Sequence, residues 1–257
     1  MTDKKILAKF KDVPVQPKII KYKALGRQIN YVEVGDDTLP MVVFIHGAPG
    51  SLADFMYFLK DSTLISKCRL ISVDRPGYGN SDYGKVETSL ERQAAMIKPI
   101  LDKNKNSKPP ILVGHSFGGP VVARMAMDYP KLVGAMILAA PAIDPDNEKI
   151  FWISYPIDWW VIKWAMPKVI RVTNDEKLSH VEELEKMLPL WEKVKTPTVF
   201  IHGHKDMLVP FANSEFGVNM LSNAQVSTIF EKKMNHLIPW NRPEVIKAAI
   251  IKCLEEE

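Results

Sequence analysis

The chain of 257 residues has the composition of an ordinary globular protein, with 46% hydrophobic and 25% charged residues. Its net charge of +4 comes from 34 basic and 30 acidic residues, and much of the excess lies early, in the lysines between Lys4 and Lys23. Because no further basic face is visible, we exclude a nucleic-acid-binding protein and expect the first residues to form a solvated basic leader.

The cysteines and the hydropathy of the sequence indicate where in the cell the protein is expected. Cys68 and Cys253 lie far apart without metal-ligand spacing, so the sequence suggests neither a disulfide framework nor a zinc site. The opening residues MTDKKILAKFKDV lack the apolar core of a signal peptide, and no uncharged run of transmembrane length occurs. We therefore expect a cytoplasmic enzyme.

Short apolar runs of strand length alternate with helical patterns along the chain. A hairpin is predicted over residues 19–25 and 29–34, and core strands over 41–45, 69–73, 111–113, 133–139, 198–201 and 226–230. Helices are predicted over 89–103, 120–129, 211–221 and 243–254. This alternation predicts an α/β fold, in which helices cover both faces of a mostly parallel sheet.

Residues 142–195 interrupt the alternation. They show no strand pattern, they end in a helical pattern broken near Pro189, and they carry the aromatic side chains Phe151, Trp152, Tyr155, Trp159, Trp160 and Trp164. We expect a helical cap insertion within a single domain over residues 1–257, with Trp152, Trp159 and Trp160 lining a substrate pocket. The alternatives are that these rings only anchor the insertion, or that the insertion lies on a membrane surface.

A serine stands at the corner between a strand pattern and a helical pattern. The segment Gly114-His115-Ser116-Phe117-Gly118 has the Gly-x-Ser-x-Gly form and joins the strand over 111–113 to the helix from Pro120. In this context the form is typical of a nucleophile elbow, because the glycines let strand and helix approach and the helix start offers unpaired amides to negative charge. We predict that Ser116 is a nucleophile; the alternative is an incidental serine in a glycine-rich turn.

A serine nucleophile needs a base and an acid that orients the base. Of the histidines, His236 is favoured because it lies between the last strand pattern and the last helix, at the carboxyl edge of the sheet. Asp206 follows the strand over 198–201 and is the predicted acid, which gives the chain order serine, aspartate, histidine. Asp144 and Asp146, one strand earlier, are the alternative acids.

The negative charge of an acyl-transfer intermediate requires preorganised N–H donors. The backbone N–H of Phe117, directly after the serine, is one predicted donor. The second is the N–H of Ala48, because the loop His46-Gly47-Ala48-Pro49-Gly50 follows a core strand and its small residues let the backbone approach a ligand.

Taken together, the motifs resemble the α/β-hydrolase superfamily over residues 22–254. The resemblance rests on FIHGAPG, VDRPGYGNSD, VGHSFGGP, PTVFIHGHKDMLVP and MNHLIPW, which occur in the order and at the spacing of that family. It implies the same triad and oxyanion residues, a structural turn at Asp74 and Arg75, and a cap at the insertion that is short in this chain.

The residues and the resemblance imply a serine hydrolase that cleaves a carboxylic ester of a small to medium apolar substrate through an acyl-enzyme, without metal or cofactor. A serine at position 116 argues against dehalogenase and epoxide-hydrolase chemistry, whose nucleophile is a carboxylate. HGAPG is similar to the oxyanion loop of proline iminopeptidases, so an aminopeptidase using Glu182, Glu183 or Glu185 is an alternative. Carbon–carbon bond hydrolases, perhydrolases and a ligand-binding receptor with little turnover are further alternatives, and the sequence does not define the oligomeric state.

Overall fold

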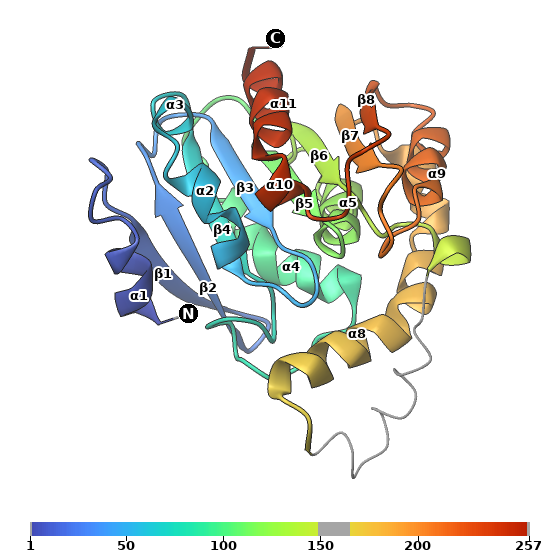
Figure 1. The fold of residues 1–257 in the computed structure, drawn as a ribbon, viewed down its shortest axis with the longest axis horizontal. Coiled ribbons are helices and arrows are strands. Elements are labelled where there is room, and N and C mark those ends of the chain that lie inside the picture. The colour runs from blue at the N-terminus through green and yellow to red at the C-terminus, as the bar shows by residue number, and fades with distance from the viewer. Residues whose placement is uncertain (1, 149–164, 256–257) are drawn as a thin grey trace.

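One mixed sheet forms the centre of the protein (Figure 1). In the computed structural model, which describes residues 2–148 and 165–255, eight strands lie in the order β1-β2-β4-β3-β5-β6-β7-β8. Their bounds are β1 Lys18–Ala24, β2 Arg27–Val34, β3 Met41–Ile45, β4 Arg69–Asp74, β5 Ile111–His115, β6 Ala135–Ala139, β7 Thr198–Gly203 and β8 Val226–Glu231. The pairs β1–β2 and β2–β4 are antiparallel and all other pairs are parallel. The predicted α/β fold with a mostly parallel sheet is confirmed.

Helices flank the sheet on both faces, and short helical turns lie in the loops. The longer helices are α4 Leu90–Leu101, α5 Gly118–Asp128, α8 Lys168–Glu185, α9 Ala212–Met220 and α11 Pro243–Glu255, and the short ones are α1 Asp3–Ala8, α2 Met56–Leu59, α3 Ser62–Ile65 and α10 Ile238–Asn241. Short 3₁₀ helices cover Leu52–Phe55, Pro145–Asn147 and Leu188–Lys193. Among the described residues, no helix is both long and apolar enough to cross a membrane.

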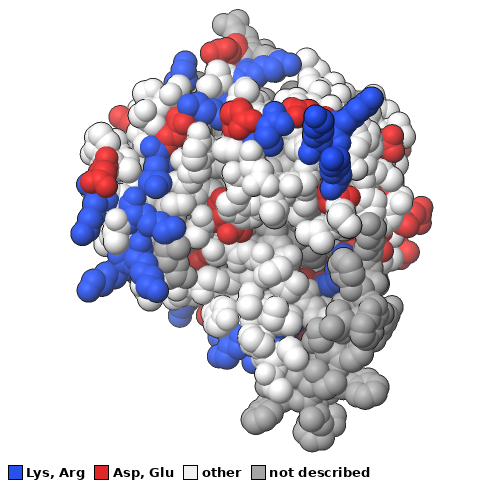
Figure 2. Space-filling view, in the orientation of Figure 1, with Lys and Arg blue, Asp and Glu red and all other residues white. Residues whose placement is uncertain are grey.

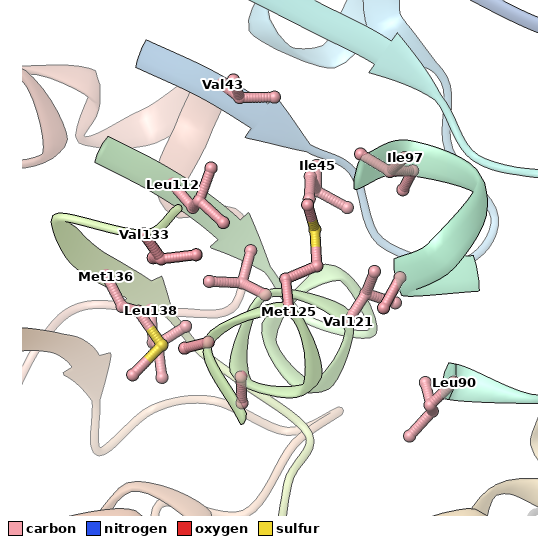
Figure 3. Packing of buried hydrophobic residues seen from close by; sticks show 14 of the residues in the cluster. Val43, Ile45, Leu90, Ile97, Leu112, Val121, Met125, Val133, Met136 and Leu138 are labelled. Atoms are coloured by element: carbon pink, nitrogen blue, oxygen red, sulfur yellow. The ribbon is translucent and has the colours of Figure 1, made fainter. Parts of the chain in front are cut away.

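Alternate residues of the central strands face opposite sides of the sheet, and each side has its own apolar cluster. Val43 and Ile45 of β3 face the cluster that contains α4 and α5, whereas Val42 and Phe44 face the cluster that contains α1, α2 and α11. Figure 3 shows Met125 of α5 packed beside the strands in the first of these clusters. Because both faces are buried, β3 and β6 consist of apolar residues alone.

The N-terminal segment is not the solvated leader that the lysines predict. It forms α1, whose N-cap is Thr2, and the side chains of Ile6 and Phe10 are fully buried against the sheet. Phe10 stands four positions after Ile6, so both reach one side of the segment while the lysines face solvent. Figure 2 shows the basic side chains gathered over α1 and β1, at the left of the view, with both charges mixed over the rest of that face.

Of the expected insertion over residues 142–195, the structure describes 142–148 and 165–195. Its main element is α8, which begins at Lys168, seven residues before the predicted helical pattern at Asp175. In Figure 1, α8 lies apart from the helices that flank the sheet. An ion pair between Glu176 of α8 and Arg75, which directly follows β4, places this helix at the carboxyl edge of the central strands.

Candidate active site

Ser116 occupies a strained turn between β5 and α5. Its φ angle is +53°, in the left-handed region of backbone conformation that residues other than glycine rarely adopt. The turn is held by a hydrogen bond from the Ser116 N–H to the Ala139 carbonyl (3.0 Å) and by one from the Gly119 N–H to the Ser116 carbonyl (2.8 Å). A side chain at Gly118 would place its Cβ 2.1 Å from the Ile45 carbonyl oxygen. The glycine is therefore required for the close approach of β3 to the start of α5.

Asp206 and His236 come from different loops and meet at the carboxyl edge of the sheet. Asp206 follows β7, and its Oδ2 lies 2.7 Å from Nδ1 of His236, which follows β8. The other carboxylate oxygen, Oδ1, accepts hydrogen bonds from the backbone N–H groups of Leu208 (2.9 Å) and Val209 (2.8 Å). Burial alone would raise the pKa of Asp206, but its hydrogen bonds, first those with His202 and His236, outweigh burial and hold that pKa well below its usual range.

A second histidine contacts the same carboxylate. His202, at the end of β7, is fully buried, with Nε2 at 3.1 Å from Asp206 Oδ2 and Nδ1 at 2.8 Å from the Ser214 hydroxyl oxygen. The sequence does not indicate this role of His202, because the contact with Ser214 depends on how α9 packs.

His115, the residue before Ser116, supports the loop that carries His236. Its Nε2 lies 2.9 Å from the backbone carbonyl oxygen of His236, and the two ring centroids are 4.9 Å apart. Burial, together with the neighbouring His236, lowers the pKa of His115 to about 3. His115 is therefore neutral at physiological pH and can hold this loop without adding charge to the site.

Arg75 holds the loop after β3 through hydrogen bonds to two of its backbone carbonyl groups. Arg75 Nη2 donates to the carbonyl of Gly47 (3.1 Å), and Arg75 Nε donates to the carbonyl of His46 (2.9 Å). Because a peptide group is planar, fixing the Gly47 carbonyl also fixes the direction of the Ala48 N–H. Arg75 is itself held by Glu176 of α8, at 2.6 Å and 3.0 Å, in an ion pair with no solvent exposure.

Ser116 and His236 line one cavity of about 320 Å³, together with Ala48 and Phe117. Within the described ranges, no hydrogen bond joins the Ser116 hydroxyl to His236, and the backbone N–H groups of Ala48 and Phe117 have no acceptor. In the same part of the chain, no group of three His, Cys, Asp or Glu side chains is arranged to hold a metal ion. Four of the five residues predicted for the triad and the oxyanion hole thus line one cavity, and the fifth, Asp206, contacts His236.

The alternative acids are engaged elsewhere. Asp144 accepts hydrogen bonds from the Asp146 N–H (3.0 Å) and from the Asn147 side-chain amide (2.7 Å), and so caps the turn over Pro145–Asn147. Neither Asp144 nor Asp146 bonds His236 in the described structure. The predicted pocket residues Trp152, Trp159 and Trp160 lie outside the described residues.

The chain matches two family models. The model described as alpha/beta hydrolase fold matches residues 40–162, and that of the prolyl oligopeptidase family matches residues 103–248.

Two of the curated proteins that the sequence resembles are epoxide hydrolases. Epoxide hydrolase 4 of Homo sapiens is 30% identical over 288 aligned positions, which cover 93% of this chain and 78% of the relative. Epoxide hydrolase 1 of Caenorhabditis elegans is 27% identical over 173 residues, which cover 65% of this chain and 41% of the relative. The chain thus spans less than half the length of some of the curated relatives that it matches.

Solved structures share the fold at low sequence identity. A putative aryl esterase from Burkholderia cenocepacia superposes with a TM-score of 0.75 at 18% identity, covering 93% of this chain and all of that one. A putative lipase from Acinetobacter baumannii gives a TM-score of 0.73 at 16% identity, with coverage of 98% and 96%. The fold, with its serine between β5 and α5, defines an α/β-hydrolase type of protein. The human relative, 30% identical and matched over 78% of its length, shows that the chain belongs to the α/β-hydrolase superfamily, as its motifs predict.

Proposed function

We propose that the protein is a serine hydrolase that cleaves a carboxylic ester through an acyl-enzyme on Ser116. The observation that carries this proposal is the shared cavity, where the strained turn presents Ser116 beside His236, whose Nδ1 lies 2.7 Å from Asp206. A nucleophile, a base and an acid that orients the base are the parts that acyl transfer needs.

In the proposed mechanism, His236 removes the Ser116 hydroxyl proton as the serine oxygen attacks the acyl carbonyl. The oxyanion accepts hydrogen bonds from the N–H groups of Phe117 and Ala48. His236 then gives its proton to the leaving alcohol. A water molecule, deprotonated by His236, attacks the acyl carbon, the bond to the Ser116 oxygen breaks, and His236 returns the proton to that oxygen as the acid leaves. The lowered pKa of Asp206 keeps that carboxylate ionised at neutral pH, where it stabilises the positively charged imidazole.

The serine distinguishes this proposal from the activity named for the epoxide hydrolase relatives. Attack by a carboxylate on an epoxide gives an ester, which water can cleave, whereas attack by the Ser116 hydroxyl would give a stable ether. An ester substrate avoids this dead end, because the serine ester that it forms is hydrolysed readily. A cap insertion over residues 142–195, with α8 as its described helix, would cover the cavity.

The aminopeptidase alternative needs a carboxylate to hold the amino group of the substrate. Glu183 instead accepts the Leu90 N–H (2.8 Å), Glu182 pairs with Lys186 (2.8 Å), and neither lines the cavity. Glu148 does line it, but Lys177 already balances the charge of this carboxylate. The ester substrate is therefore better supported.

Hydrolysis of p-nitrophenyl esters from acetate to long acyl chains tests the proposal, with the wild type and Ser116→Ala assayed side by side. We expect turnover by the wild type and a fall of at least about 10³-fold in the variant, with an unchanged melting temperature because no core volume is lost. Wild-type turnover no greater than that of Ser116→Ala would overturn the proposal and favour a ligand-binding protein.

A further inference from the structure

The wall of the cavity formed by α8 is polar, although the wall near Ser116 is apolar. Lys177 and His180 of α8 line the cavity together with Glu148, which precedes the undescribed part of the insertion. Pro49 and Phe117 line the same cavity. A pocket built for a hydrocarbon chain alone has no need of these polar side chains, since burying them is costly.

Two members of this polar group satisfy each other. The carboxylate of Glu148, 3% exposed, is paired with the ammonium group of Lys177. Burial would raise the pKa of Glu148, but His180 and Lys177 outweigh burial and keep that pKa below its usual value. The pair is thus ionised at neutral pH and carries no net charge, so it does not favour a charged ligand of either sign.

His180 contacts Glu148, but its hydrogen-bonding capacity is not filled. Its side chain is 1% exposed, and Nδ1 lies 3.2 Å from Glu148 Oε1, yet within the described residues neither ring nitrogen makes a hydrogen bond of acceptable geometry. The ring packs against that of Phe117, with centroids 4.4 Å apart, so it lies beside the residue that directly follows the nucleophile. A buried polar group without a hydrogen-bond partner destabilises the folded protein. A ligand that supplies this hydrogen bond therefore binds more tightly than one that does not.

We propose that His180 is the specificity-determining residue of a polar subsite, and that the preferred substrate is an ester of a hydroxy acid. A hydroxyl group can both donate and accept a hydrogen bond, so it can serve either ring nitrogen of His180. An acyl chain without the hydroxyl would fill the same space and leave His180 unpaired. The subsite refines the proposed function, on which it rests, by replacing a plain apolar acyl group with a hydroxylated one.

Two esters of the same shape test the subsite: p-nitrophenyl 3-hydroxybutanoate and p-nitrophenyl 3-methylbutanoate, in which a methyl group replaces the hydroxyl. The measured quantity is the ratio of their kcat/KM values. His180→Leu should lower this ratio about tenfold, as expected for one net hydrogen bond. Comparing ratios between enzymes cancels the different chemical reactivity of the two esters.

His180→Gln keeps one donor and one acceptor and should retain a ratio above that of His180→Leu. His204→Leu is the matched control, because His204 is exposed and does not line the cavity; it should leave the ratio unchanged. Ser116-dependent hydrolysis with the same ratio in the wild type and His180→Leu would overturn the subsite alone. Absence of Ser116-dependent hydrolysis of both esters would overturn the proposed function and the subsite with it.

Discussion

Asp206 and Asp144 follow neighbouring strands, but they hold different partners. Asp206 contacts His236, whereas Asp144 caps a turn. Asp206→Asn should lower kcat about 10⁴-fold, because the amide favours the wrong imidazole tautomer, and Asp144→Asn should have little effect. The measurement is kcat for p-nitrophenyl butanoate, and the reverse ranking would move the acid to Asp144.

The buried neutral state of His115 makes stability depend on pH. Its pKa is about 3 in the folded protein against 6.5 when unfolded, so between these values the unfolded chain binds more protons and stability falls as pH falls. From pH 7 to pH 5 this one group should remove about 2 kcal/mol from the free energy of unfolding. Urea-induced unfolding at both pH values measures this change. In His115→Gln, the free energy of unfolding should fall between pH 7 and pH 5 by about 2 kcal/mol less than in the wild type. The exposed control His204→Gln should behave as the wild type, and an equal loss in His115→Gln would contradict the account.

Local context was enough to predict which residues meet at the site, but not their supporting partners. Ser116, Asp206 and His236 each follow a recognisable strand, and parallel strands bring such positions to one edge. The roles of His202 and His180 depend on side chains that α9 and the α5 turn bring to them. No spacing in the sequence indicates those contacts.

At the scale of elements, α8 is tied to the body by the ion pair of Arg75 with Glu176, and both side chains are fully buried. Glu176→Gln leaves the guanidinium without its charge partner and should lower the free energy of unfolding by about 3–5 kcal/mol. Glu182→Gln, on the same helix but exposed, should leave it nearly unchanged. Urea-induced unfolding of both variants makes the comparison, and equal effects would show that the buried pair does not fasten α8.

Long periodic elements were predicted well, and single-turn elements were missed. The predicted helix over 211–221 corresponds to α9 at Ala212–Met220, whereas α2 and α3, with four residues each, are too short to show a helical period. The Arg75–Glu176 pair spans 101 positions in the sequence. Such a pair leaves no local pattern, so the anchoring of α8 could not be predicted.

At the scale of the whole molecule, the N-terminal segment is part of the fold. Phe10 is fully buried in the cluster that includes α2 and α11, whereas Leu7 is 46% exposed. Phe10→Ala should lower the free energy of unfolding by about 3–5 kcal/mol, and Leu7→Ala should change it far less. Urea-induced unfolding measures this difference. A Phe10→Ala variant as stable as the wild type would instead support the predicted solvated leader.

The order of the strands could not be derived from burial patterns. The central strands are apolar on both faces, so β3 carries no sign that β4 and β5 are its neighbours. Their order follows from the direction in which each crossover winds. Family resemblance, rather than periodicity, therefore supplied the specific α/β-hydrolase expectation.

The most direct test of the central claim is covalent labelling with a fluorophosphonate, followed by intact-mass and peptide mass spectrometry. An activated serine attacks this reagent as it would attack an ester carbonyl, and an ordinary hydroxyl does not. The account predicts one adduct, on the peptide that contains Ser116, lost in Ser116→Ala and strongly reduced in His236→Ala. No adduct on the wild type, or an adduct on a residue other than Ser116, would contradict it.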